Sequence, residues 1–278
     1  MHPVVNHLIQ LQELTMVRAE QKAAGREEAL ETLDSSILTL TEALAEEMRQ
    51  AVAQLQRRDT LFIVPVANGV CAGCGMQLPT SLVQAVRLAH QVYRCPICTR
   101  ILYHPVAGLH RAAATIPSRL APRKIGIQRF SDLSLMCPRL DATDRDEAIR
   151  EMAQLLCEKG YANDPARLAE AAIQREAIVS TAVEHGLAFP HVRGVEGGGL
   201  TLALGLSRKG IRFGSGRTLT RIIFFMTIPT AASAFYLKLL AGLTSVFQDA
   251  EARRALMAET TSEGLWKTLN RLTRPTIP

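Results

Sequence analysis

The 278-residue sequence contains few aromatic residues, few cysteines and no long apolar run. Aromatic residues make up 5% and hydrophobic residues 47% of the chain, which is ordinary for a folded protein and excludes collagen-like, low-complexity and fully disordered classes. The longest stretch without charge, 60–86, is interrupted by two prolines and three glycines, and the most apolar window, 222–237, is short and contains Pro229. We therefore expect no membrane-spanning helix.

A secretory signal is also missing, because no basic segment leads into an apolar stretch near the N-terminus. Six cysteines are too few for a disulfide scaffold, and four of them form two CxxC pairs. In a chain without an export signal such pairs indicate a bound metal rather than disulfides. The expected location is the reducing cytoplasm.

Acidic residues are absent from 60–131, which carries 8 basic residues. Residues 1–59 carry 6 basic and 10 acidic residues, and residues 132–278 carry 18 basic and 16 acidic residues. The acid-free stretch indicates either an anionic partner or an internal negative charge that it balances. These changes in charge also suggest where the chain divides into structural parts.

Apolar residues spaced three or four positions apart predict two antiparallel helices within 1–59. One apolar stripe runs from about Glu28 to Gln56, another from Val4 to Val17, and 22–25 provides a turn. Two helices bury little apolar surface, so we expect the hairpin to pack on the next part of the chain or to form a homo-oligomer. A spacing element is the simpler interpretation, and a partner-binding helix pair is the alternative.

The strongest chemical signal is a set of four cysteines in two CxxC pairs, separated by 20 residues: Cys71, Cys74, Cys95 and Cys98. A two-residue gap lets both sulfurs of a pair reach one ion, and the glycines at 73 and 75 permit the tight turn. A redox CxxC usually occurs singly near a βαβ unit, which is not seen here. The spacing predicts a structural Zn²⁺ bound by four thiolates, with a short helix over 81–90 between the pairs.

The order of helical hairpin, CxGCxxxLP, helix and CPxCxRILY resembles bacterial proteins with an antiparallel coiled coil and a four-cysteine zinc ribbon, over 4–103. The resemblance implies a ribbon that is suspected of binding nucleic acid. Arg87, Arg94 and Arg100 alternate with Tyr93 and Tyr103, a composition that suits phosphate contacts and base stacking. The alternative is that these arginines solvate the ribbon and balance its thiolates.

From residue 130 onward, helical and strand patterns alternate. Helices are expected after caps at Asp144, Asp164 and Ser262 and over 232–247 and 250–258, and strands over 200–206 and 220–227. This pattern predicts an α/β fold with a mixed sheet and flanking helices. The domains expected are therefore a helical hairpin at 1–59, a zinc ribbon at 60–103, a basic, proline-containing linker at 104–129 and an α/β domain at 130–275.

Two histidines, His185 and His191, lie six positions apart between the second helix and the first long strand of this α/β domain, with Arg175 and Arg193 nearby. Pro190 restricts the backbone just before His191 and favours an extended chain there. An imidazole can act as a nucleophile towards phosphorus near neutral pH, and an arginine can neutralise phosphoryl oxygens. We expect an exposed His191 ring beside the Arg175 guanidinium.

The same segment resembles the IIA domain of the fructose and mannitol class of the bacterial phosphotransferase system, including its nitrogen-regulatory relatives. The family pattern is roughly R-E-x-x-x-S-T-G-I-G-x-G-[IV]-A-[IV]-P-H, over about 130–272. The matching residues are Arg175, Glu176, Ser180, Thr181, Gly186, Ala188, Pro190 and His191. The resemblance implies that His191 accepts a phosphoryl group from an HPr-like carrier and passes it to a IIB domain or a regulatory target, with Arg175 as the active-site arginine.

The sequence departs from this family at several positions. Tyr236 stands where the family usually has a second active-site histidine, and a tyrosine cannot carry positive charge. Ala182 and Glu184 replace two family glycines. The candidate neighbours of the active site are Thr181, His185 and Tyr236.

The favoured function is a cytoplasmic phosphohistidine carrier or regulator, with the enzymatic activity of a IIA component. The alternative is a zinc ribbon that binds nucleic acid or protein, attached to a catalytically silent IIA-like sensor domain.

Overall fold

The structure of the protein is a computed structural model that describes residues 3–27, 30–105, 109, 124–214, 216 and 218–277. The chain forms two compact units, Met1–Gly108 and Leu109–Pro278, each of which is described by itself. Most of the predicted linker, 106–108 and 110–123, lies outside the described residues. Within the described part of the chain, no helix is long and apolar enough to cross a membrane.

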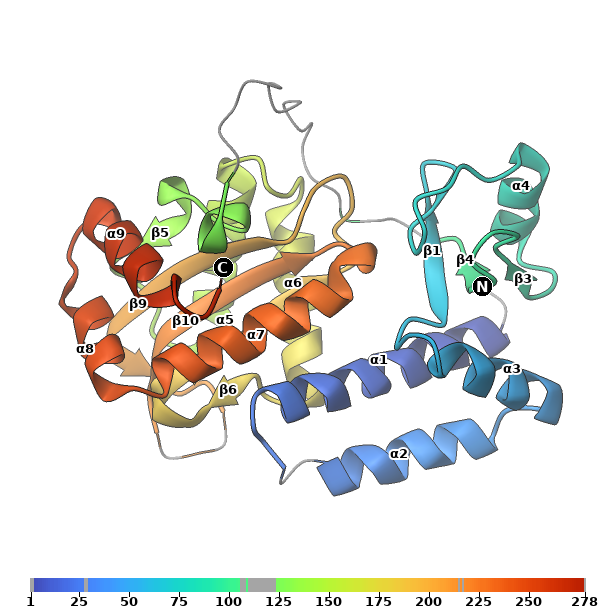
Figure 1. The fold of residues 1–278 in the computed structure, drawn as a ribbon, viewed down its shortest axis with the longest axis horizontal. Coiled ribbons are helices and arrows are strands. Elements are labelled where there is room, and N and C mark those ends of the chain that lie inside the picture. Colours follow the sequence, from blue (N-terminus) through green and yellow to red (C-terminus); the bar gives the residue numbers. More distant parts are fainter. Residues whose placement is uncertain are drawn as a thin grey trace. The chain divides into compact units, whose positions relative to one another are not determined.

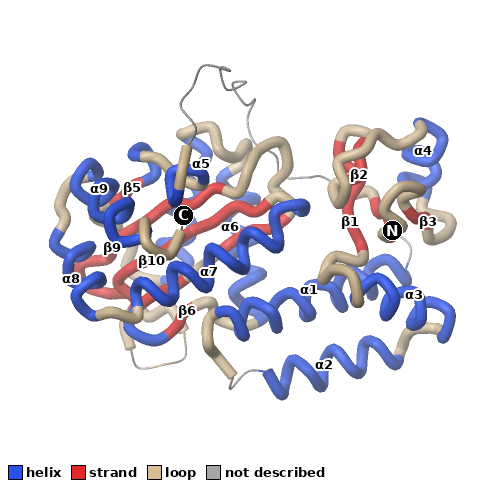
Figure 2. The backbone as a smooth tube through the Cα atoms, in the orientation of Figure 1, coloured by secondary structure: helices blue, strands red, loops and turns tan. Residues whose placement is uncertain are grey.

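The first unit combines helices with a small four-stranded sheet (Figures 1 and 2). Its helices are α1 (Pro3–Ala23), α2 (Leu30–Glu42), α3 (Glu46–Gln56) and α4 (Thr80–Leu88), and its strands are β1 (Ile63–Ala67), β2 (Val70–Cys71), β3 (Tyr93–Arg94) and β4 (Ile101–Tyr103). The strand order is β2-β1-β4-β3, in which β1 and β4 are parallel and the other two pairs are antiparallel. Helix α4 confirms the helix predicted between the two cysteine pairs.

Helices α1 and α2 lie side by side and run in opposite directions, as the apolar stripes predict (Figure 1). The turn between them includes Gly25, whose φ of 72° is in the left-handed region that favours glycine. The single helix expected from about 28 to 56 is instead two helices, because Ala45 adopts an extended ψ of 146° and starts α3 in a new direction. The break places Val52 and Leu55 of α3 in the same buried cluster as Leu8 of α1.

The helices of the first unit pack on its sheet. One buried cluster joins residues of α1 and α3 to Phe62 just before β1, Ile63 in β1 and Ile101 in β4. Gln12 of α1 extends this contact, since its Oε1 accepts hydrogen bonds from the backbone N–H groups of Phe62 (2.8 Å) and Ile63 (2.9 Å) and its Nε2 donates to the Ile63 carbonyl (2.8 Å). The apolar residues of α1 and α3 are therefore partly covered by the ribbon, and a homo-oligomer through the hairpin stays a prediction.

The second unit is an α/β fold with a six-stranded mixed sheet. Its strands are β5 (Met136–Cys137), β6 (Ala182–Val183), β7 (Leu187–Ala188), β8 (His191–Arg193), β9 (Thr201–Ile211) and β10 (Thr220–Ile228). Its α-helices are α5 (Arg145–Glu158), α6 (Pro165–Ile178), α7 (Ser233–Phe247), α8 (Ala250–Ala258) and α9 (Ser262–Thr273). Figure 1 shows α7 on one face of the long strands β9 and β10, with α5 and α6 on the other face.

The sheet order is β5-β9-β10-β7-β6, and β8 also pairs with β10. Strands β9 and β10 are antiparallel, whereas β7 and β8 both run parallel to β10 along its other edge. The α/β fold with a mixed sheet and flanking helices is thus confirmed. Helices on both faces explain buried runs such as Phe224–Met226, in which neighbouring side chains point to opposite faces of the sheet and all are buried.

Local helix signals in this unit are mostly confirmed. The side chains of Asp144 and Asp164 accept hydrogen bonds from backbone N–H groups in the first turns of α5 and α6, and Pro165 opens α6. The cap of α9 is Thr261 rather than the predicted Ser262, whose hydroxyl instead donates to the Met136 carbonyl at 2.8 Å. At the start of the unit, residues 126–129 form a short 3₁₀ helix with Ile127 buried, where the linker was expected to continue.

Candidate metal centre and candidate phosphoryl site

The four predicted cysteines come together in the first unit. Their sulfur atoms all lie within 4.8 Å of one another, with 3.7 Å between Cys71 Sγ and Cys98 Sγ and 3.8 Å between Cys74 Sγ and Cys95 Sγ. Four sulfurs placed tetrahedrally about 2.3 Å from one zinc ion would be about 3.8 Å apart. The donor set and its spacing therefore fit a zinc ion bound by four thiolates.

Two backbone turns of the same kind position the sulfurs. In the first pair the N–H of Gly75 donates to the Cys71 carbonyl at 2.8 Å, and in the second the N–H of Thr99 donates to the Cys95 carbonyl at 2.9 Å. The residue after each pair has a positive φ, 74° at Gly75 and 64° at Thr99. The sequence pointed to the glycine but not to the threonine, because threonine rarely adopts this conformation.

Arg100 links the metal centre to the rest of the first unit. Its guanidinium forms an ion pair with Asp59 at 2.5 Å and donates to the Leu61 carbonyl at 2.9 Å. Burial acts to raise the pKa of Cys98, but hydrogen bonds from the backbone and side chain of Arg100, together with those from neighbouring cysteines, outweigh it and lower the pKa to about 7. Burial raises the pKa of Cys71, so a bound cation is what would keep that thiolate charged.

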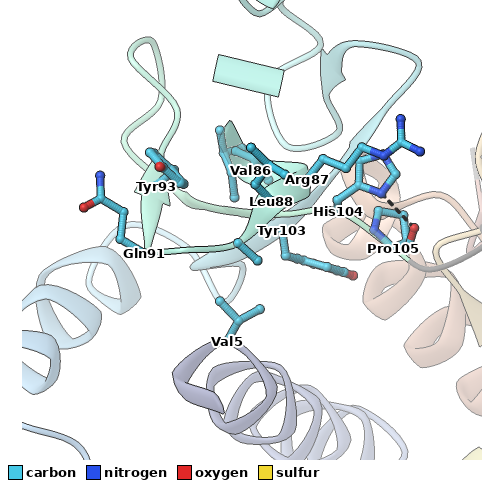
Figure 3. A pocket seen from close by; sticks show the side chains of 11 residues that line it. Val5, Val86, Arg87, Leu88, Gln91, Tyr93, Tyr103, His104 and Pro105 are labelled. Carbon is cyan, nitrogen blue, oxygen red and sulfur yellow. Dashed lines mark hydrogen bonds between the residues drawn. The ribbon is translucent and has the colours of Figure 1, made fainter. Parts of the chain in front are cut away.

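A cavity of about 300 Å³ lies beside the ribbon, between α4, β3, β4 and the start of α1 (Figure 3). Arg87, Tyr93, Tyr103 and His104 line it around an apolar floor that includes Val5. None of the described residues that line it is acidic. Of the three arginines expected around the ribbon, Arg87 is the one in this lining, whereas Arg100 is bound to Asp59.

In the second unit, the sheet fixes His191 at the start of β8. Pro190 lacks an N–H, yet its carbonyl accepts a hydrogen bond from Met226 at 3.0 Å, and His191 pairs with Met226 in the parallel register of β8 and β10. Pro190 therefore interrupts the edge between β7 and β8 without losing the connection to β10. The extended backbone expected before His191 is confirmed.

The His191 ring is held through its Nδ1 atom. This nitrogen lies 3.0 Å from the Phe189 carbonyl oxygen and 3.1 Å from Tyr236 Oη, and the two rings are 4.8 Å apart between centroids. A carbonyl can only accept, so Nδ1 carries the proton and the lone pair of the neutral ring is on Nε2. The Tyr236 oxygen then accepts from the same N–H.

The expectation of an exposed His191 ring is wrong. His191 is 1% exposed, and Tyr236, also 1% exposed, lies beside its ring at an interplanar angle of 40°. Tyr236 contributes to the burial of His191, because its aromatic ring at the start of α7 packs on the imidazole and excludes water. The sequence indicated that Tyr236 lies near the site but not that it covers it.

Arg175 lies near the end of α6, which packs against β8. It is 7% exposed, and its Nη1 donates to the Val179 carbonyl at 3.0 Å. The next residue, Glu176, is also buried, and its carboxylate accepts from the Thr181 N–H (2.6 Å), the Thr181 hydroxyl (2.7 Å) and the Ser180 hydroxyl (2.7 Å). Thr181 is thus bound to Glu176, and its carbonyl accepts from the Phe189 N–H at 3.3 Å.

His185 is placed differently from His191. It lies on an exposed turn with a φ of 65°, and its Nε2 is 3.8 Å from Glu184, whose side chain is 89% exposed. Within the described residues, Glu184 is a charged neighbour of His185. Of the candidate neighbours, Tyr236 directly contacts His191.

Sequence reasoning missed two residues that contribute to this site. Glu176 was recognised only as part of a pattern, although its buried carboxylate orders the loop after α6 through hydrogen bonds from Ser180 and Thr181. Arg193 was noted only as nearby, but its guanidinium lies 5.0 Å from the Tyr236 ring centroid and donates to Ser233 Oγ at 3.0 Å. The period of two along β8, which places residues 191 and 193 on one face, is the signal that could have identified it.

Comparisons with known proteins match both units. The family model described as "Phosphoenolpyruvate-dependent sugar phosphotransferase system, EIIA 2" matches residues 132–272, half of the chain, and the model described as "C4-type zinc ribbon domain" matches residues 70–102. A curated relative is the PTS system fructose-specific EIIABC component of Bacillus subtilis (strain 168), 24% identical over 133 residues. That match covers 47% of this chain and 21% of the relative, so the chain spans about a fifth of the relative's length.

Solved structures similar to this chain include two IIA proteins. The nitrogen regulatory protein IIA-Ntr from Neisseria meningitidis is 25% identical, with a TM-score of 0.46, and the match covers 50% of this chain and 96% of that one. IIA mannitol from Escherichia coli is 20% identical, with a TM-score of 0.43, and the match covers 50% of this chain and 97% of that one.

Proposed function

We propose, since this chain belongs to the EIIA 2 family of the phosphoenolpyruvate-dependent sugar phosphotransferase system, that His191 accepts a phosphoryl group from an HPr-type carrier. The phosphorylated chain then passes the group to a IIB domain or uses it as a regulatory signal. One observation carries the proposal: Nδ1 lies 3.0 Å from the Phe189 carbonyl oxygen, a contact that favours the proton on Nδ1 and leaves the lone pair of the ring on Nε2.

The transfer step follows from this tautomer. The Nε2 lone pair bonds to phosphorus while the phosphorus–nitrogen bond of the donor breaks, and the donor nitrogen keeps the electron pair of that bond. His191 retains its Nδ1 proton, so the product ring is a cation whose N–H stays on the Phe189 carbonyl. Arg175 supplies positive charge from α6 for the phosphoryl oxygens.

The burial of His191 adds a requirement to this proposal. A ring that is 1% exposed cannot meet a phosphoryl donor until the side chains that cover it move. Tyr236 lies in the first turn of α7, next to Phe235, which is 59% exposed. Docking of the donor over this part of α7 is therefore the expected route to the ring.

Labelling with a matched histidine control tests the proposal. The full chain is incubated with phosphoenolpyruvate, enzyme I and HPr, and intact mass is measured without acid, because a phosphorus–nitrogen bond is acid-labile. We expect one phosphoryl group on the wild type and on His185→Ala, and none on His191→Ala. An unlabelled wild type, or a label that persists in His191→Ala, would refute the carrier function.

We also propose that the four cysteines bind one structural zinc ion, which ties the two knuckles of the ribbon together. Four thiolates leave no coordination position for substrate, so the metal has no catalytic role in this proposal. A reducing compartment such as the cytoplasm suits four unpaired thiols.

The alternative function, binding of single-stranded nucleic acid by the ribbon, is favoured by one observation. Arg87, Tyr93 and Tyr103 line the same cavity, which offers a cation and two aromatic rings without a carboxylate. Fluorescence titration of a labelled oligonucleotide at several salt concentrations tests it. Binding that weakens with salt and is reduced in Arg87→Gln, but not in Arg94→Gln on the exposed β3, would support this alternative.

A further inference from the structure

Arg193 stands on the same face of β8 as His191. Side chains alternate along a strand, so residues 191 and 193 point to one side of the sheet and Val192 to the other. Both are fixed by the parallel pairing with β10, His191 opposite Met226 and Arg193 opposite Ile228. The position of Arg193 relative to the imidazole is therefore set by regular backbone.

Two residues of α7 hold the guanidinium of Arg193. Ser233 Oγ accepts from its Nη1 at 3.0 Å, and the centroid of the Tyr236 ring lies 5.0 Å from its Cζ. The Ser233 hydroxyl is itself oriented, because it donates to the Thr230 carbonyl at 3.0 Å. Ser233 and Tyr236 are three residues apart and so lie on one face of the helix.

Tyr236 contacts both His191 and Arg193. Its ring is 4.8 Å from the imidazole and its hydroxyl is 3.1 Å from Nδ1, while the guanidinium of Arg193 is placed over the ring. The arrangement places the guanidinium of Arg193, which is always protonated, on the side of the imidazole where α7 lies. Arg175 approaches β8 from the other element, α6.

We propose that Arg193 supplies the second positive charge of the phosphoryl site, and that Ser233 and the Tyr236 ring hold it in place. A phosphoryl group on Nε2 brings close to two negative charges into a buried site. Tyr236 cannot offset that charge, but Arg193 can, and its rigid fork suits phosphoryl oxygens. This inference rests on the proposed phosphorylation of His191 and assigns the charge on the α7 side of it.

The test uses a small phosphoryl donor beside the protein donor. Phosphoramidate labels histidine without a carrier: the Nε2–phosphorus bond forms, the phosphorus–nitrogen bond of the donor breaks, and ammonia leaves with the electron pair. The rate of labelling at His191 is followed by ³¹P NMR and intact mass for the wild type, Arg193→Gln, Arg193→Lys and Ser233→Ala. Arg271→Gln, an exposed charge loss on α9, is the control.

We expect Arg193→Gln to slow labelling about tenfold, since one charge-assisted interaction with the phosphoryl oxygens is lost. Arg193→Lys should react at a rate between those of Arg193→Gln and the wild type, because it keeps the charge but loses the planar fork. Ser233→Ala should slow labelling about threefold, since Arg193 loses a hydrogen-bond partner that holds it in place. Arg271→Gln should react like the wild type.

Each other outcome overturns a stated part of the reasoning. Arg193→Lys as slow as Arg193→Gln, or Arg193→Gln as fast as the wild type, would show that the charge at 193 does not assist transfer. Labelling of His191 by phosphoramidate but not by HPr would refute the carrier function while the Arg193 comparison still holds. No label from either donor would overturn both.

Discussion

Replacement of Gly186 by alanine should destabilise the second unit through a backbone clash. Gly186 has a φ of 75°, and a Cβ built on it would lie 2.8 Å from the Leu219 carbonyl oxygen. Gly160, after α5 in the same unit, has a φ of 76°, and no atom lies within 4 Å of its Cβ position. The two alanine variants therefore carry the same backbone strain, and only Gly186→Ala adds a collision with rigid backbone.

The size of the effect follows from these two contributions. Left-handed backbone costs an alanine about 1–2 kcal/mol at either position. Overpacking against atoms that cannot easily move costs a further 1–3 kcal/mol, roughly, at Gly186 alone. We expect Gly160→Ala to lower the free energy of unfolding by about 1 kcal/mol and Gly186→Ala by about 3 kcal/mol. The second value would shift the midpoint of thermal unfolding by about 6–12 °C in a domain of this size.

The single tryptophan makes this measurement specific. Trp266 lies in α9 of the second unit, so its fluorescence during urea unfolding follows the unit that contains both glycines. The turn at Gly186 leads through β7 to His191. We therefore expect phosphoryl labelling of Gly186→Ala to fall below that of Gly160→Ala. Equal losses of stability in the two variants would refute the argument from the carbonyl contact.

Three further predictions concern other parts of the chain. Metal analysis should find one zinc per chain in the wild type and in Cys157→Ser, because Cys157 is outside the cluster. Cys74→Ser should hold less than one zinc per chain, and its first unit should unfold at a lower temperature. Gln12→Met should lower the stability of the first unit by about 2–4 kcal/mol, because it removes the acceptor of two backbone N–H groups. The control Gln10→Met, at an exposed position on α1, should change the stability by less than about 0.5 kcal/mol. Urea unfolding followed by circular dichroism measures both. Burial acts to raise the pKa of Asp132, but hydrogen bonds from Ser134 and Tyr161 outweigh it and lower the pKa, so its stabilising contribution is present above about pH 4 and is lost as the solution becomes more acidic. Tyr161→Phe should therefore be less stable than the wild type at pH 7, and the difference should disappear towards pH 2; a difference that persists there would contradict the assignment.

Short-range features of the chain were predictable from its sequence. The four cysteines were assigned to one centre because a CxxC spacing restricts both sulfurs of a pair to one ion, whatever surrounds them. The aspartates at 144 and 164 were recognised as caps because a cap forms within one helical turn. The bounds proposed for the individual domains remain predictions.

Long-range contacts were not predictable in the same way. Gln12 reaches β1 across about 50 positions of the chain, Asp59 pairs with Arg100 across 41, and Tyr236 meets His191 across 45. Periodicity places a residue on a face of its helix or strand but does not say which side chain of another element lies opposite. The break at Ala45 was missed because the apolar stripe continues past it to Val52 and Leu55, so the pattern does not show where one helix ends and the next begins.

The sequence by itself determined which reactive groups this protein offers: cysteines spaced for one ion, and a histidine after a proline in a segment that resembles the IIA pattern. Only the tertiary structure decided the surroundings of that histidine, including a buried ring, a proton directed to Nδ1 and an arginine held over a tyrosine. The physical reason is that residue type and spacing define the reactive atoms, whereas solvent access and electrostatic partners come from elements that meet only after the chain has folded.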